Sequence, residues 1–326
     1  MKKRPPRNVL LISAVLFLIG FFMTSRITNI WGLYLSYGVL CGLGVGLSYN
    51  AILSTVPKWL PGRGGFATGT LLMGMGLGSL ILGIMVKRIM DIYTWPSAFR
   101  ILSATFFILF FAGSFFVKNP EAAGQTVKER DSVGDLPLLE MLKNKDYWSI
   151  FIWSVMASSI GLGIVSNSGY MATEAGVHES SLALMVGMVS VGNGAGRLIF
   201  GAVVDKIGGK KAMAMGNLVF ILGLILAIAS RKTGIALFIT VGFILAGVGY
   251  GSSPTLSAAL TKKRFGEKYY PQNLSAIVLA LIPASIIGPT ISANVYQQTG
   301  QYMNVYLIML GMAFLAFLPV KIYKED

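Results

Sequence analysis

One arginine, Arg197, lies inside an apolar run at residues 182–204. A charged side chain at the centre of a membrane helix costs at least about 2.5 kcal/mol, so we expect it to have a function. Its planar guanidinium can bind a carboxylate through two parallel hydrogen bonds, which suits a small organic anion. Asn193 precedes Arg197 by four residues and therefore shares its helix face. Two structural explanations stay open: the guanidinium could reach the membrane surface along about seven residues, or it could pair with an acid in the loop that follows.

Further polar and aromatic side chains on the apolar runs are candidates for the same binding cavity. Tyr250 lies in a glycine-rich stretch, where small side chains would leave space for a ligand. An interhelical hydrogen bond or an interfacial tyrosine explains each candidate equally well, and glycine runs are more typical of helix packing than of ligand contacts. The remaining candidates for substrate binding are Tyr49, Asn50, Asn167 and Tyr170.

A short charged segment, residues 201–211 (GAVVDKIGGKK), joins two apolar runs. Gly201 permits close helix contact, because backbones approach only where side chains are small. Asp205 falls at a predicted helix end, where a carboxylate can face the positive N-terminus of a neighbouring helix or pair with a base. The other notable positions supply a tight turn and positive charge on the inner side of the membrane: Lys206, Gly208, Gly209, Lys210 and Lys211.

The composition fixes the class of protein to which these residues belong. The chain has 326 residues, of which 54% are hydrophobic and 12% charged, with a mean hydropathy of +0.69. Soluble domains carry about twice that charged fraction, so a soluble enzyme and a secreted disulfide scaffold are excluded. The single Cys41 and the single His178 cannot form a metal cluster. We expect no cofactor, no metal and no catalytic activity, because no phosphate-binding loop or nucleophile–base arrangement is present.

Ten apolar segments are long enough to cross a bilayer. Of the 27 Lys and Arg residues, twenty lie in the termini and the loops on the same side, six lie in the opposite loops, and Arg197 lies within a span. This asymmetry predicts a multi-pass protein of the cell membrane with both termini in the cytoplasm, and it explains the net charge of +14 without nucleic-acid binding. The predicted spans are 8–25, 31–53, 65–86, 97–117, 148–172, 182–204, 212–229, 235–260, 273–294 and 301–320.

An internal repeat organises these spans into two halves. The glycine runs at 42–46 (GLGVG) and 247–251 (GVGYG) are 205 residues apart, and the spans that follow them repeat at the same offset. We predict an N-terminal bundle at 1–117, a cytoplasmic linker at 118–147 with a short amphipathic helix, and a C-terminal bundle at 148–326. The first half has four spans and the second has six. Either the protein works with ten helices, or the chain begins inside a longer one.

The segment 201–211 resembles the inner loop motif of the major facilitator superfamily. Residues 37–50 (YGVLCGLGVGLSYN), the glycines of 65–69 (GFATG), the NGAGR sequence at 193–197 and the GYG sequence at 249–251 resemble helices four, five, eight and ten of oxalate/formate antiporter-like transporters. Related monocarboxylate transporters also carry an arginine in the eighth helix. The resemblance covers helices three to twelve and implies an all-α fold of two helical bundles without the first two helices. It also implies alternating access, with 201–211 as a conformational latch.

Two departures from the family pattern bear on the substrate. The oxalate carriers place a lysine in the eleventh helix, whereas residues 273–295 of this chain hold no cation. A single interior cation balances a monoanion such as formate, acetate or lactate better than a dianion, so oxalate is the second choice. Interior acids for proton coupling are also scarce: Glu174 ends a span, Asp91 falls in a loop and Asp205 belongs to the latch. Exchange against a counter-anion or facilitated uniport fits better than proton symport, which stays open.

Two alternatives to carboxylate transport remain. The first is a truncated protein that inserts into the membrane and does not transport, which would explain the four spans against six. The second is the same fold with a different small solute, such as a cationic drug, although the scarcity of interior acids argues against a cation.

Overall fold

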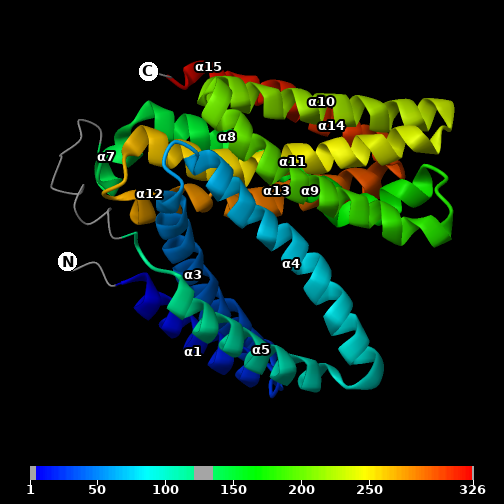
Figure 1. Cartoon of the computed structure of the whole chain (residues 1–326). Helices are drawn as coiled ribbons and strands as arrows, with labels where there is room; N and C mark the ends of the chain where they lie inside the picture. Colours follow the sequence, from blue (N-terminus) through cyan, green and yellow to red (C-terminus); the bar gives the residue numbers. More distant parts are fainter. Residues whose placement is uncertain (1–4, 121–134, 325–326) are drawn as a thin grey trace. The chain divides into compact units, whose positions relative to one another are not determined.

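The computed structural model describes residues 5–120 and 135–324, apart from several side chains in α4 and α9. Within these ranges the chain is helical and no strand occurs, which confirms the predicted all-α class. The first elements are α1 (Pro6–Thr24), α2 (Ile30–Leu33), the π-helix η1 (Tyr34–Cys41), α3 (Gly42–Thr55), the 3-10 helix η2 (Val56–Trp59), α4 (Gly64–Ile92) and α5 (Trp95–Phe116) (Figure 1). The others are α7 (Leu138–Lys143), α8 (Lys145–Glu174), α9 (Glu179–Ile207), α10 (Gly209–Thr233), α11 (Ala236–Phe265), α12 (Tyr270–Val278), α13 (Leu281–Thr299), α14 (Tyr302–Leu315) and α15 (Phe317–Ile322).

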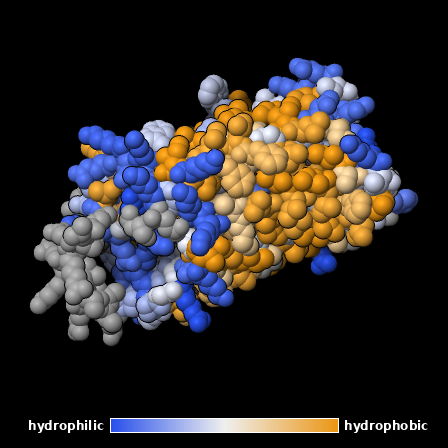
Figure 2. Space-filling view, turned by 90° about the horizontal axis from the view of Figure 1, so that it is seen from above, coloured by the Kyte–Doolittle hydropathy of each residue, from blue (hydrophilic) through white to orange (hydrophobic). Residues whose placement is uncertain are grey.

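Each predicted span coincides with a helix or with consecutive helices. By length and composition, nine helical segments among the described residues can cross a membrane. Helix α4 is not one of these nine; it has 29 residues, and several of its side chains lie outside the described part of the chain. Two spans are interrupted where a proline removes a backbone donor: α12 ends before Pro283, and α14 ends before Pro319. On the face of the protein shown in Figure 2, apolar side chains form a broad band with hydrophilic side chains at both ends.

Two details differ from the sequence prediction or lie outside what the structure describes. The sequence places Asp91 in a loop, whereas α4 continues to Ile92 because nothing breaks the helix before the Thr94–Pro96 turn into α5. The short helix expected in the linker is confirmed as α7. The rest of the predicted linker, at 121–134, lies outside the described residues.

The chain divides into two compact units. One comprises Met1–Pro61 with Ile81–Arg130, and the other comprises Gly62–Leu80 with Asp131–Asp326. The first part of α4 thus packs with the helices that follow residue 131, although residues 81–130 of the other unit separate them in the sequence. The domain boundaries at 117 and 148 stay a prediction.

The first unit is held by an aromatic cluster between α1 and α5. The ring centroids of Phe17 and Phe110 are 4.8 Å apart, and those of Phe21 and Phe106 are 5.2 Å apart. Cys41 is 5% exposed and packs against these phenylalanines, as expected for a small buried hydrophobe. Aromatic rings bury a large apolar area, so these side chains fill the space between α1 and α5 that smaller aliphatic side chains would leave open.

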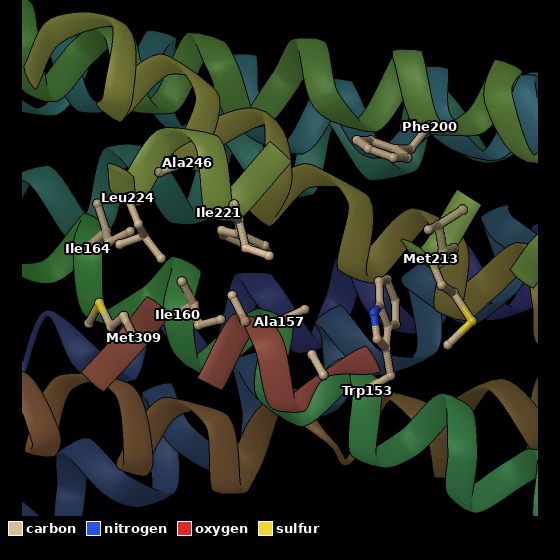
Figure 3. Close-up of a cluster of buried hydrophobic side chains, with 14 of the residues drawn as sticks. Trp153, Ala157, Ile160, Ile164, Phe200, Met213, Ile221, Leu224, Ala246 and Met309 are labelled. Atoms are coloured by element: carbon tan, nitrogen blue, oxygen red, sulfur yellow. The ribbon is translucent and has the colours of Figure 1, made fainter. Parts of the chain in front are cut away.

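The core of the second unit surrounds α8. Trp153 is fully buried, and its indole nitrogen donates to Asn217 Oδ1 on α10 at 2.9 Å. Ile160 of α8 lies near Leu224 of α10 and Met309 of α14 in the same cluster (Figure 3). Serine hydroxyls join α8 to α11 on the other side, through Ser154, Ser158, Ser253 and Ser257 at 2.8–3.1 Å. In a membrane the hydrophobic effect does not drive helices together, so close packing of small side chains and hydrogen bonds between polar ones hold them in contact.

Ion pairs fasten the two ends of this unit. Asp146, at the start of α8, is 3% exposed and accepts from Arg264 Nε of α11 at 2.6 Å. At the opposite end, Glu174 pairs with Arg231 of α10 at 2.7 Å and accepts from the Tyr302 backbone nitrogen at 2.9 Å. Glu174 therefore ends its helix as expected, and its charge is matched by a neighbouring arginine.

Candidate functional site

Glycines bring α9 into close contact with two other helices of the second unit. On one side, a Cβ added to Gly65 of α4 would lie 2.6 Å from the Gly201 carbonyl oxygen. On the other side, a Cβ added to Gly192 would lie 2.5 Å from the Ile244 carbonyl oxygen of α11, and one added to Gly251 would lie 2.7 Å from the Arg197 nitrogen. No side chain fits at these contacts, so the backbone around Arg197 is fixed between α4 and α11.

The Arg197 guanidinium points back along α9, toward its N-terminal end. Its Nε donates to Asn193 Oδ1 at 3.1 Å, and its Nη1 donates to the Leu72 carbonyl oxygen of α4 at 2.6 Å. To reach the nearer membrane surface the guanidinium would have to point in the other direction, toward the end of α9 at Ile207. The contacts therefore disfavour that explanation and confirm that Asn193 and Arg197 share a face.

The alternative of a pair with the following loop is also disfavoured. Asp205 lies eight positions after Arg197, which is about 12 Å along a helix. Its carboxylate accepts from the Gly65 backbone nitrogen at 3.0 Å and from the Phe66 backbone nitrogen at 2.9 Å. These are donors in the first turn of α4, where backbone N–H groups have no partner within the helix. Asp205 thus faces the positive end of a neighbouring helix, as the sequence predicts.

The other residues of 201–211 shape the turn between α9 and α10. Gly208 has φ of 84°, a left-handed conformation that favours glycine, and Gly209 begins α10 against Leu260 of α11. Lys210 Nζ donates to the Lys321 carbonyl oxygen at 3.4 Å. The side chains of Lys206 and Lys211 are exposed.

Tyr250 lies beside the α9–α11 contact. Its ring packs against Gly161 of α8, whose missing side chain makes room for it, and the next residue, Gly251, touches the Arg197 backbone. The ring is partly buried. The second unit therefore brings Arg197, Asn193 and Tyr250 into one region, on two helices that glycines hold together.

The other four predicted site residues lie on other helices, α8 of the second unit and α3 of the first unit. Asn167 accepts from the Tyr302 hydroxyl at 3.4 Å and donates to the Gly163 carbonyl oxygen at 3.0 Å, so its amide makes an interhelical bond. Tyr170 is 72% exposed. Tyr49 and Asn50 belong to α3 in the first unit, where Asn50 Nδ2 donates to the Gly46 carbonyl oxygen at 2.9 Å. The Asn50 Oδ1 atom is buried and has no hydrogen-bond partner among the described residues.

Substitution at the α9–α11 contact is expected to test how tightly the site is positioned. Gly251→Ala places a methyl group against the Asn193 carbonyl and the Arg197 nitrogen, and overpacking of this kind costs about 1–3 kcal/mol. We expect a lower melting temperature of the purified protein. Gly187→Ala is the control, because a Cβ there meets nothing within 4 Å. It should leave the melting temperature equal or raise it, since alanine favours a helix over glycine. Equal melting of both variants would show that the contact is looser than described.

Comparison with known proteins yields similarity over the whole chain. A family model described as Major Facilitator Superfamily matches residues 1–168 and 154–326. The chain is 27% identical over 283 residues to the uncharacterized MFS-type transporter YhjX of Escherichia coli, covering 86% of this chain and 69% of that protein. It is 27% identical over 316 residues to the oxalate:formate antiporter of Oxalobacter formigenes, covering 96% of this chain and 74% of that protein. It is 23% identical over 334 residues to human monocarboxylate transporter 10, covering 96% and 64%.

A solved structure shows the same fold. The crystal structure of the transporter FucP superposes on the whole chain with a TM-score of 0.69, at 15% identity and over 85% of that protein. At this identity the likeness concerns the arrangement of helices and carries no information on the substrate.

Proposed function

Because the chain belongs to the major facilitator superfamily, we propose that it carries a small organic anion, a monocarboxylate, across the membrane by alternating access. Families with this fold are transporters, and the helices described here are those of a multi-pass membrane protein.

One observation carries the choice of an anion: the placement of the Arg197 guanidinium. It lies within a helix long enough to span the membrane and is oriented by Asn193 and the Leu72 carbonyl. Such orientation lowers the entropy lost when the fork binds a carboxylate. An entering carboxylate would compete with the neutral Leu72 carbonyl for Nη1, and a charge-assisted bond is about twice as strong as a neutral one. Asn193 and Tyr250 would shape the same site.

The choice of a monoanion follows from the charge of the neighbouring helices. Helices α12 and α13, at 270–299, contain no lysine or arginine. A second carboxylate would therefore enter an apolar region without a partner, which is costly. Formate, acetate and lactate are the substrates favoured, and oxalate is second. The names of two relatives, an oxalate:formate antiporter and a monocarboxylate transporter, support this class.

The contact between Asp205 and α4 supplies the proposed latch. In the predicted division, α4 belongs to the bundle at 1–117 and α9 to the bundle at 148–326, joined by the linker at 118–147. Breaking and remaking two hydrogen bonds to one carboxylate would accompany each change of access. Gly201, Lys206, Gly208, Gly209, Lys210 and Lys211 would keep the latch loop close to α4 and on the cytoplasmic side.

Exchange against a counter-anion, or facilitated uniport, is the proposed mode. Glu174 is paired with Arg231, and Asp205 accepts hydrogen bonds from α4, so both carboxylates make structural contacts. The protein would lie in the cell membrane with both termini in the cytoplasm. A carrier of a different solute is the alternative that the following experiment separates, and a chain that inserts without transporting would give no uptake into proteoliposomes.

Acetate and acetamide provide a matched pair for the test, because they share shape and differ in charge. The purified protein is heated with increasing concentrations of each, and the melting temperature is recorded. A ligand that binds only the folded protein raises the melting temperature with concentration. We expect acetate, formate and lactate to stabilise and acetamide to have no effect. Equal effects of acetate and acetamide, or stabilisation by a cationic dye alone, would refute an anion site.

A further inference from the structure

A surface groove runs between α8 and the last two helices of the second unit, α14 and α15. Its volume is about 470 Å³, within the range of pockets that hold small molecules. One wall is a single face of α8 and the other is a face of the α14–α15 segment, and both α14 and α15 contact α8. The lining residues are Lys145, Trp148, Ser149, Ile152, Met156, Leu315, Leu318, Pro319 and Ile322.

The groove is apolar along its length and has a closed floor. The Ser149 hydroxyl donates to the Pro319 carbonyl oxygen at 2.5 Å, which holds the two walls together and satisfies the one polar side chain of the floor. Ile152 is 46% exposed and Leu318 is 56% exposed. Both lie on segments long enough to span a membrane, and their exposed apolar side chains are suited to contact with lipid acyl chains.

The groove ends at a cation beside a fixed aromatic ring. Lys145 is the first residue of α8, is exposed and lines the groove. Trp148 is oriented by its indole nitrogen, which donates to the Leu142 carbonyl oxygen at 3.0 Å, and by an edge contact with Phe151. A tryptophan with a bonded N–H beside a lysine is typical of the level of lipid headgroups.

The charge at this end of the groove is positive. Asp146 follows Lys145, but its carboxylate is bound to Arg264 and to the Lys324 backbone nitrogen at 3.0 Å. The exposed Lys321 of α15 adds a second cation to this end of the unit. A cation in the first turn of a helix is opposed by the helix dipole, so an external anion would remove an unfavourable interaction at Lys145.

We propose that this groove binds one anionic phospholipid of the inner leaflet. One acyl chain lies between Ile152 and Leu318, and the phosphate lies against Lys145. Water in the groove would find few hydrogen-bond partners along its apolar walls, and a free phosphate would leave this apolar length uncovered. Basic pockets between membrane helices on the cytoplasmic side bind anionic lipid headgroups, and the predicted topology places Lys145 on that side. The proposal does not depend on carboxylate transport.

Native mass spectrometry of the delipidated full-length protein tests the proposal. Phosphatidylglycerol and phosphatidylcholine with identical acyl chains are added separately, and the bound fraction is measured against concentration. We expect phosphatidylglycerol to bind more tightly. Lys145→Gln should weaken phosphatidylglycerol by about fivefold and leave phosphatidylcholine unchanged, because one lysine near a lipid surface contributes about that much. Ile152→Trp should weaken both lipids, since the indole fills the channel for the acyl chain.

Matched controls lie on α10, outside the groove. Lys232→Gln removes an exposed lysine at the last turn of α10, and Leu222→Trp enlarges a side chain that is 55% exposed. Neither should change the binding of either lipid, and melting temperatures confirm that all four variants are folded. Equal affinity for the two lipids in the unaltered protein would overturn the proposal. So would a Lys145→Gln variant that retains the preference for phosphatidylglycerol.

Discussion

Replacement of Arg197 by alanine is expected to reduce carboxylate uptake into proteoliposomes by at least about 100-fold. Two charge-assisted hydrogen bonds to the substrate are lost, each contributing about 1.5–3 kcal/mol, and each 1.4 kcal/mol is tenfold in affinity. Arg197→Lys should be intermediate, because an ammonium keeps the charge and loses the planar fork that binds both carboxylate oxygens. The measurement is initial uptake of labelled acetate at a fixed protein-to-lipid ratio.

Arg100→Ala is the matched control for this prediction. Arg100 lies near the start of α5 and is exposed, so its removal should leave uptake within about twofold, as for surface substitutions in general. Melting temperature separates a lost site from a lost fold, because Arg197 also bonds to α4. Uptake that persists in a folded Arg197→Ala protein would remove Arg197 from the binding site.

Replacement of Asp205 by alanine is expected to have the second largest effect. Two backbone N–H groups of α4 lose a charged acceptor, at about 1.5–3 kcal/mol for each bond. If this contact forms in one state of the transport cycle and breaks in the other, its loss shifts the balance between the states by at least about tenfold. We expect slower uptake with little change in the acetate concentration that gives half-maximal stabilisation. Asp205→Asn keeps one acceptor oxygen, so its rate of uptake should lie between those of the unaltered protein and the Asp205→Ala variant.

Asp91→Ala provides the control on the same helix. Asp91 lies in the last turn of α4, where an acid opposes the helix dipole, so its removal should not lower stability or uptake. Uptake is thus compared between loss of Asp205, which bonds to the start of α4, and loss of Asp91, which lies at the end of the same helix. Equal uptake by the Asp205→Ala and Asp91→Ala proteins would show that the Asp205 bonds do not limit transport.

The sequence predicts most of the fold because apolar runs and prolines act locally. Each predicted span coincides with one helix or with consecutive helices, and the all-α class and the superfamily are confirmed. The interruption between α12 and α13 was not predicted, although Pro283 marks it, because apolar residues continue on both sides. The sequence prediction ends α4 too early because a run of charged residues indicates a loop, whereas Lys87, Arg88 and Asp91 continue the helix.

For contacts between distant segments, the sequence predicts the type of interaction but does not identify the partner residue. An acid at a helix end predicts that Asp205 faces a helix N-terminus, but nothing local identifies Gly65, 140 residues earlier, as the donor. The pairing of Asn193 with Arg197 follows from helical spacing. The Leu72 carbonyl has no signature in the sequence, because backbone acceptors are the same at every residue. Gly65 and Gly69, four residues apart on one face of α4, were the available signal for the close contact with α9.

The most direct test of the central claim is exchange of labelled acetate by the reconstituted protein. Proteoliposomes are loaded with unlabelled formate, acetate, acetamide or buffer, and entry of external labelled acetate is followed. A monocarboxylate carrier that exchanges anions should take up label fastest against internal formate or acetate, and Arg197→Ala should abolish the uptake. Facilitated uniport would give uptake that is equal against all four interiors and still depends on Arg197. Uptake no greater than in protein-free liposomes would contradict the account.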